Sequence, residues 1–172
     1  MILLRHGQSE FYLHFGQSRQ DPGIEDPKLT PLGHAQAEQA AEALAGEGLT
    51  RILVSPYTRA LQTAAPIAER LGLAITITPV IRERYAFVCD VGSRRSALEA
   101  AWPGHDFSVI EEVWWPGGEE PKAQVERRAG AFRTEMAASP EWHRTLVVSH
   151  WGFILALTGR QIGNGEWLRL AA

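Results

Sequence analysis

The stretch Leu3-Leu4-Arg5-His6-Gly7-Gln8-Ser9-Glu10 places an arginine, a histidine and a glycine directly after an apolar run. Such a run is typical of a short buried strand, and the glycine lets the backbone turn where the strand ends. In open α/β sheets, ligands bind at the carboxyl ends of the strands. The pattern therefore predicts that Arg5 and His6 lie at a ligand-binding edge.

Two later segments repeat this arrangement of an apolar run followed by a nitrogen-rich side chain. Residues 52–54 are apolar and precede Arg59, and residues 146–148 are apolar and precede His150. Three strands would then bring four such side chains to one edge of a sheet: Arg5, His6, Arg59 and His150. These groups would make a poor hydrophobic core, but they suit binding of a phosphate and attack on it.

The rest of the chain alternates between helical and extended patterns. Thr30 and Pro31 are an N-cap and a first helical residue, and Ser55-Pro56 repeats this device. We expect helices over 31–44, 56–71, 93–102, 121–138 and 152–157, and further strands over 73–78 and 166–170. Residues 10–28 are polar, aromatic and turn-rich, and they predict a loop over the site.

This alternation predicts an α/β fold, a three-layer αβα sandwich around a largely parallel sheet. A length of 172 residues favours a single domain over 1–172.

Composition narrows the classes of partner and compartment. The net charge is −3 without an apparent basic face, which argues against a nucleic-acid partner. Cys89 is the only cysteine, which excludes an internal disulfide and fits a cytoplasmic protein. No apolar stretch approaches ~20 residues and no signal peptide is evident, so we expect no membrane partner. The oligomeric state stays open.

Five short motifs, in order along nearly the whole chain, carry a resemblance to a known family. They are Arg5-His6-Gly7, Leu29-Thr30-Pro31-Leu32-Gly33, the segment 55–64, Arg82-Glu83 and Val148-Ser149-His150. Together they resemble the histidine phosphatase superfamily, also called phosphoglycerate mutase-like. The resemblance implies that fold and a phosphomonoester hydrolase that forms a phosphohistidine.

The resemblance also implies a role for each site residue. His6 would be the nucleophile, and Arg5, Arg59 and His150 would bind the phosphoryl group, with no metal and no other cofactor. Glu83 would protonate the leaving oxygen and then deprotonate water. The chemistry adds two expectations: a backbone acceptor holds the other N–H of His6, and partial burial raises the pKa of Glu83.

Three features depart from the family pattern. Tyr12 stands where many members carry an asparagine that contacts phosphate, so we expect its hydroxyl to replace that ligand. Trp151 follows His150 where a small residue is common, and it would narrow the site. Residues 84–86 match only part of the stretch that mutases carry, which favours hydrolysis over mutase chemistry.

The substrate is expected to be a small phosphorylated molecule, with a phosphoprotein as a further option. A second anionic group would meet some of five cations: Lys28, Arg82, Arg84, Arg94 and Arg95. Trp114 and Trp115 would instead form a pocket wall that selects an aromatic or apolar alcohol. His14, in the covering loop, is a further candidate for substrate contact.

Alternatives remain for the proton-transfer residue and for the function. Glu10, Glu111 and Glu112 compete with Glu83 for the acid–base role. A phosphoglycerate mutase-type isomerase and a non-catalytic phospho-ligand-binding module are the alternative functions.

Overall fold

Five strands form one sheet at the centre of the computed structural model, which describes residues 1–171. They are β1 (Ile2–Arg5), β2 (Arg51–Val54), β3 (Ile75–Ile77), β4 (Thr145–Ser149) and β5 (Trp167–Arg169), in the order β3-β2-β4-β1-β5. All neighbours pair in parallel except β5, which runs antiparallel to β1. The largely parallel sheet is therefore confirmed.

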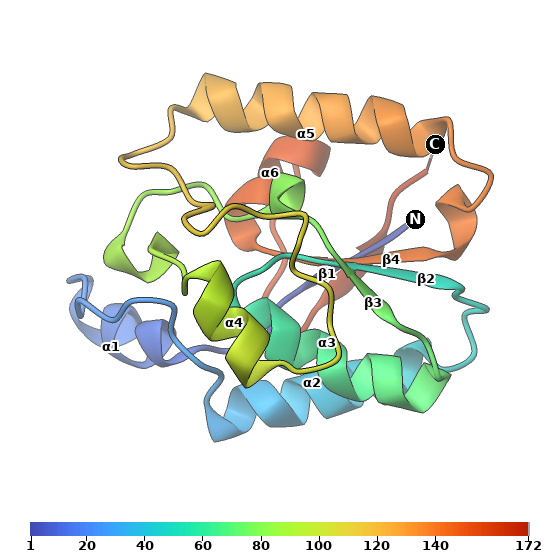
Figure 1. The fold of residues 1–172 in the computed structure, drawn as a ribbon, viewed down its shortest axis with the longest axis horizontal. Helices are drawn as coiled ribbons and strands as arrows, with labels where there is room; N and C mark the ends of the chain where they lie inside the picture. Colours follow the sequence, from blue (N-terminus) through green and yellow to red (C-terminus); the bar gives the residue numbers. More distant parts are fainter. Residues whose placement is uncertain (172) are drawn as a thin grey trace.

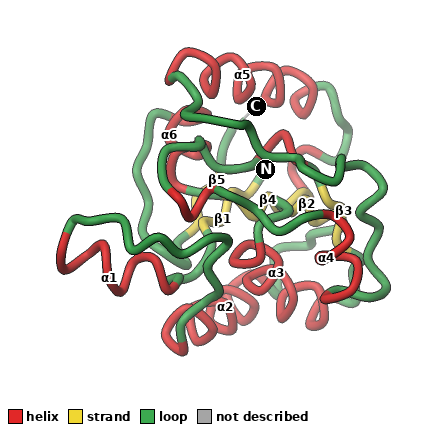
Figure 2. The backbone as a smooth tube through the Cα atoms, turned by 60° about the vertical axis from the view of Figure 1, so that its left-hand side comes forward, coloured by secondary structure: helices red, strands yellow, loops and turns green. Residues whose placement is uncertain are grey.

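Helices cover both faces of this sheet. They are α1 (Glu10–Ser18), α2 (Pro31–Leu44), α3 (Thr58–Leu71), α4 (Arg95–Ala101), α5 (Lys122–Ala137) and α6 (Trp151–Thr158), with 3-10 turns at Pro79–Ile81, Val88–Asp90 and Trp142–Arg144. In Figures 1 and 2, α2 and α3 lie on one side of the strands and α5 and α6 on the other. The expected three-layer sandwich is confirmed.

Alternation along the strands explains the layers. In β1, Ile2 and Leu4 pack in the cluster that includes α2 and α3, whereas Leu3 packs with α5 and α6. In β4, Val147 likewise points away from its neighbours Leu146 and Val148. Because both faces are buried, these strands are apolar at every position rather than at every second one.

The structure corrects two expectations near the carboxyl ends of the strands. Residues 10–18 form helix α1 rather than a loop, and Phe11 and Phe15, one turn apart, stack with ring centroids 5.0 Å apart. Helix α3 begins at Thr58 rather than next to Ser55, whose hydroxyl is engaged by a buried histidine instead of capping the helix.

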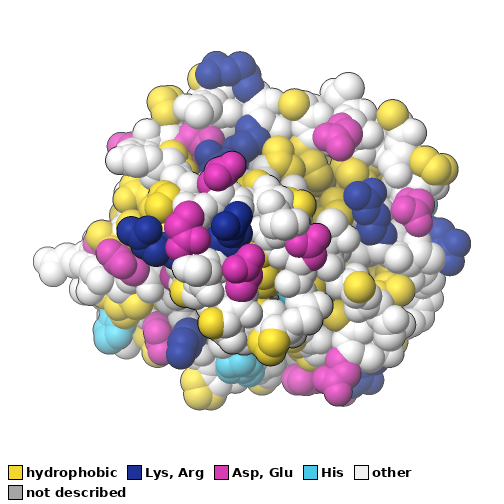
Figure 3. Space-filling model, viewed as in Figure 1, with side chains coloured by type: hydrophobic (Ala, Val, Ile, Leu, Met, Phe, Trp, Pro, Cys, Tyr) yellow, Lys and Arg dark blue, Asp and Glu magenta, His cyan; other side chains and the backbone are white. Residues whose placement is uncertain are grey.

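Positive and negative side chains are interspersed on the face of the molecule shown in Figure 3. None of the helices within residues 1–171 combines the length and the apolar character needed to cross a membrane.

Candidate active site

His6 lies at the end of β1, where the chain leaves the sheet. Its side chain is buried, and Nδ1 lies 2.7 Å from the carbonyl oxygen of Gly7. A carbonyl only accepts, so Nδ1 carries the proton and Nε2 keeps its lone pair. Burial, followed by the charges of Arg59 and Arg5, holds the pKa of His6 well below its usual value. The imidazole is therefore neutral near neutral pH, with Nε2 available as a nucleophile, as the sequence predicts.

Glycines make the turn after His6 possible. The Gly7 N–H donates to Thr63 Oγ1 at 3.0 Å, which ties the turn to α3. A Cβ on Gly7 would overlap the backbone of Gly33 in α2, and a Cβ on Gly33 would overlap the carbonyl of Gln8. The start of α2 therefore packs directly on the Arg-His-Gly turn, which explains both glycines.

Arg5 is anchored by the segment that follows α6. Its Nη1 donates to the Ile162 carbonyl at 2.8 Å, and Asn164 Nδ2 donates to the backbone oxygen of His6 at 3.1 Å. The buried Nε of Arg5 has no partner among the described residues. The guanidinium also lies 5.1 Å from the ring centroid of Tyr12, on α1. Arg5 thus retains donor capacity for an anion.

Arg59, in the first turn of α3, is buried and held by an acidic residue that sequence reasoning missed. Its Nη1 donates to the Cys89 carbonyl at 2.9 Å, and its Nη2 pairs with Asp90 Oδ1 at 3.2 Å. The guanidinium carbon lies 4.4 Å from the centroid of the Tyr57 ring. The Cys89 thiol is buried and its pKa is raised, chiefly by burial, which fits the expected inert, hydrophobe-like cysteine.

His150 is fully buried directly after β4 and lies beside His6, with ring centroids 5.1 Å apart. Its Nε2 is 2.8 Å from Ser55 Oγ, and its Nδ1 has no partner among the described residues. When the Ser55 hydroxyl donates to Nε2, the Nδ1–H is left free to donate to an anion. Burial and Arg59 lower the pKa of His150, so it acts as a neutral donor.

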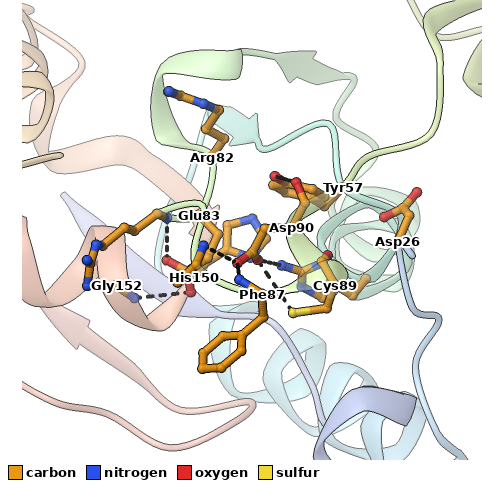
Figure 4. Close-up of polar contacts among 12 residues, drawn as sticks. Asp26, Tyr57, Arg82, Glu83, Phe87, Cys89, Asp90, His150 and Gly152 are labelled. Atoms are coloured by element: carbon orange, nitrogen blue, oxygen red, sulfur yellow. Dashed lines mark hydrogen bonds and ion pairs between the residues drawn. The ribbon is translucent and has the colours of Figure 1, made fainter. Parts of the chain in front are cut away.

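Glu83 follows the Pro79–Ile81 turn and meets the N-terminus of α6. Its carboxyl accepts from three backbone N–H groups: Arg84 at 2.8 Å, Gly152 at 3.1 Å and Phe153 at 3.2 Å. Figure 4 shows Glu83 beside Gly152 and His150, with Asp90 near them. Burial and then repulsion by Asp90 raise the pKa of Glu83, as expected, while the N–H donors oppose the shift.

A cavity of about 370 Å³ opens over these groups. Its polar lining includes Arg5, His6, Arg59, Glu83 and Asp90; its aromatic lining is Phe11, Tyr12, Phe15, Phe87 and Trp151. His150 lies behind His6 rather than in the lining. The structure thus brings all six candidate site residues into one region.

Several other candidates lie outside the cavity. Among the described residues, the lining does not include Glu10, Glu111, Glu112, His14, Lys28, Arg82, Arg94, Arg95, Trp114 or Trp115. The expected wall of Trp114 and Trp115 is therefore wrong. Trp114 packs on Tyr57 and donates to the Ser93 carbonyl at 2.8 Å, so these tryptophans support the segment that carries Asp90 rather than the cavity.

The aromatic lining from α1 was also missed, although the sequence carried a signal for it. Phe11 and Phe15 are four residues apart, which is the spacing of one helical face. Within residues 1–171, no three His, Cys, Asp or Glu side chains are grouped so as to hold a metal ion.

A neutral buried imidazole, two guanidinium groups and a carboxyl with a raised pKa around one cavity are the parts of a phosphoryl-transfer site on an α/β sandwich. The chain belongs to the histidine phosphatase superfamily (branch 1), whose family model matches residues 1–169.

Named relatives cover most of the chain. A glucosyl-3-phosphoglycerate phosphatase of Mycobacterium tuberculosis is 30% identical over 193 residues, covering 99% of this chain and 84% of that protein. A Yersinia enterocolitica protein named "Probable phosphoglycerate mutase GpmB" is 31% identical over 152 residues, covering 87% and 68%. The solved structure of mycobacterial glucosyl-3-phosphoglycerate phosphatase with VO3 has a TM-score of 0.67 at 28% identity, covering 97% and 88%.

Proposed function

We propose that this chain is a phosphomonoester hydrolase that works without a metal ion, through a phosphohistidine on His6. The observation that carries the proposal is the Nδ1 contact of His6 with the Gly7 carbonyl at 2.7 Å. It leaves Nε2 unprotonated and points the chemistry to that atom. Relatives named as phosphatases support the choice of hydrolysis.

The first step transfers the phosphoryl group to the enzyme. His6 Nε2 attacks phosphorus, the N–P bond forms, and the bond from phosphorus to the leaving oxygen breaks. Arg5, Arg59 and the Nδ1–H of His150 hold the phosphoryl oxygens, and the Tyr12 hydroxyl is the further ligand. The leaving oxygen takes its proton from Glu83, so the product is a neutral alcohol.

The second step returns the enzyme to its starting state. Glu83, now ionised, takes a proton from water, which attacks phosphorus as the N–P bond breaks. Inorganic phosphate leaves, His6 is again neutral and Glu83 is again protonated. The carboxyl must hold a proton in one step and release it in the other, which its raised pKa favours.

Phosphate release from a general phosphomonoester, measured in excess chelator, tests the proposal. We expect wild type to release phosphate with chelator present, and His6→Ala to release none. Brief exposure to ³²P-labelled substrate should label wild type with an acid-labile, base-stable phosphate. Activity lost in chelator, or retained by His6→Ala, would contradict the mechanism.

A phosphoglycerate mutase is the second candidate, supported by the name of the Yersinia relative. The two functions differ in the fate of the phosphoryl group. Incubation with 3-phosphoglycerate and its bisphosphate primer separates them: a hydrolase releases phosphate, whereas a mutase produces 2-phosphoglycerate with little release.

A further inference from the structure

Three phenylalanines form a single cluster in the wall of the cavity. Phe11 and Phe15 come from α1, and Phe87 comes from the segment before the Val88–Asp90 turn. Their ring centroids are 5.0, 5.5 and 5.2 Å apart, pair by pair. Two elements far apart in the sequence therefore build one continuous aromatic surface next to the phosphoryl-binding groups.

Part of the aromatic lining is open to solvent. Phe87 is 40% exposed and Trp151 is 38% exposed, whereas His6 is 2% exposed at the bottom of the same cavity. Water on this surface is unfavourable, and a bound apolar group would displace it. The leaving group of a substrate whose phosphorus is at His6 extends from the bottom of the cavity toward this surface.

Cations offer little to a second anionic group of the substrate. Arg84 lines the cavity, but its Nη2 pairs with Glu119 at 2.7 Å and its Nε donates to the Glu120 carbonyl at 2.8 Å. Arg59 is paired with Asp90. Arg19 also lines the cavity, but it is exposed and lies against the Phe15 ring, with its guanidinium carbon 5.8 Å from the centroid.

We propose that the leaving-group side of this cavity binds a hydrophobic alcohol, so that the preferred substrates are phosphomonoesters of aryl-bearing or other apolar alcohols. This inference rests on the phosphatase function proposed above. The reaction is unchanged: the bond from phosphorus to the alcohol oxygen breaks, and Glu83 supplies the proton. The aromatic cluster and Trp151 contribute by burying the body of the alcohol.

The test compares 2-phenylethyl phosphate with ethyl phosphate, whose leaving alcohols differ little in acidity. Any difference in kcat/KM between the two esters then reports contacts with the phenyl group rather than intrinsic reactivity. We expect wild type to favour 2-phenylethyl phosphate by about tenfold or more, and to favour it over 3-phosphoglycerate.

Substitutions on α1 and at the cavity opening locate the effect. Phe15→Ala and Phe87→Ala should each lower the ratio of the two kcat/KM values several-fold. Leu13→Ala is the matched control, because Leu13 is an exposed residue of the same helix that does not line the cavity. It should leave the ratio unchanged, and thermal melts verify that all three variants fold.

Two results would overturn the inference while leaving the phosphatase function intact. One is a wild-type ratio near one. The other is a preference for 3-phosphoglycerate that Arg19→Gln abolishes, which would assign the opening to an anion. Failure to hydrolyse any of the three esters, together with no ³²P label on His6, would overturn both proposals.

Discussion

Glu83 is the residue on which the proposed chemistry makes opposite demands. Three backbone N–H groups favour its carboxylate, and burial favours its acid form. The balance raises the pKa, so that both forms are accessible near neutral pH. A carboxyl held in this way suits a group that first gives and then takes a proton.

We expect Glu83→Gln to lower kcat by about 10²- to 10⁴-fold on alkyl phosphates, because an amide can neither donate to the alcohol nor activate water. p-Nitrophenyl phosphate needs little acid assistance, so the first turnover should survive and appear as a burst in stopped-flow absorbance. Glu111→Gln, at an exposed site outside the cavity, is the control. Equal steady-state rates in Glu83→Gln and wild type would reject the role of Glu83.

Asp90 predicts a pH effect. Its negative charge raises the pKa of Glu83, and the first step needs Glu83 protonated, so kcat/KM falls as pH rises through that pKa. Asp90→Asn removes the charge and should move this alkaline limb to lower pH, together with some loss of activity as Arg59 loses its partner. The acid side should show no His6 titration down to pH 6, because the pKa of His6 is well below 6.5. An unshifted alkaline limb in Asp90→Asn would refute the coupling.

The sequence could not predict Asp90 as part of the site. Asp90 and Arg59 are 31 residues apart, and Asp90 sits in an irregular segment with no periodic pattern. The strand-end residues were predictable because an apolar run states where its own carboxyl end lies. A carboxylate brought in by a connecting segment has no comparable local pattern.

At the scale of elements, the first turn of α2 and the Arg-His-Gly turn are in direct backbone contact. Thr30 Oγ1 accepts from the Gly33 N–H at 3.0 Å and donates to Gln8 Oε1 at 2.9 Å, so the helix cap also contacts the site loop. This capping by Thr30 was predictable from Thr30-Pro31. The equivalent prediction at Ser55 was wrong because that hydroxyl binds His150 instead.

Gly33→Ala should destabilise the protein by about 1–3 kcal/mol, because the added Cβ overlaps the Gln8 carbonyl and backbone must move. Gly130→Ala is the matched control, since Gly130 lies inside α5 with nothing within 4 Å of an added Cβ. It should stabilise by about 0.5–1 kcal/mol, through helix propensity. Urea unfolding measures both, and changes of the same sign would contradict this packing.

At the scale of the whole molecule, a buried ion-pair network fixes the long connection between β3 and α5. Glu120 pairs with Arg128 of α5 at 2.6 Å and with Arg82 at 3.3 Å. Arg128 also donates to the carbonyls of Val80 and Arg82, at 2.7 and 2.9 Å. The segment that carries Glu83 is thereby tied to the outer helix layer.

Glu120→Ala should cost about 3–5 kcal/mol of unfolding free energy, because it leaves two largely buried arginines without their carboxylate. Its neighbour gives the comparison: Glu119 is 70% exposed and pairs with Arg84, so Glu119→Ala should cost no more than about 1 kcal/mol. Denaturant unfolding of both variants is the measurement. Similar losses would show that the network contributes little.

The architecture as a whole was predictable and this network was not. Alternating apolar strands and capped helices predicted the sandwich, since each pattern is local. Arg82 was expected near the substrate, because its charge next to Glu83 says nothing about Glu120, 38 residues away. Pairings of this kind arise only once the layers have assembled.

The anchoring of Arg5 by Ile162 and of the His6 backbone by Asn164 has a consequence for reading genomes. An open reading frame that stopped after residue 158 would still encode every side chain assigned here to catalysis. We expect its product to lack phosphatase activity, which assay of the truncated chain would check. A count of intact motifs would class such a gene as functional when it is a pseudogene.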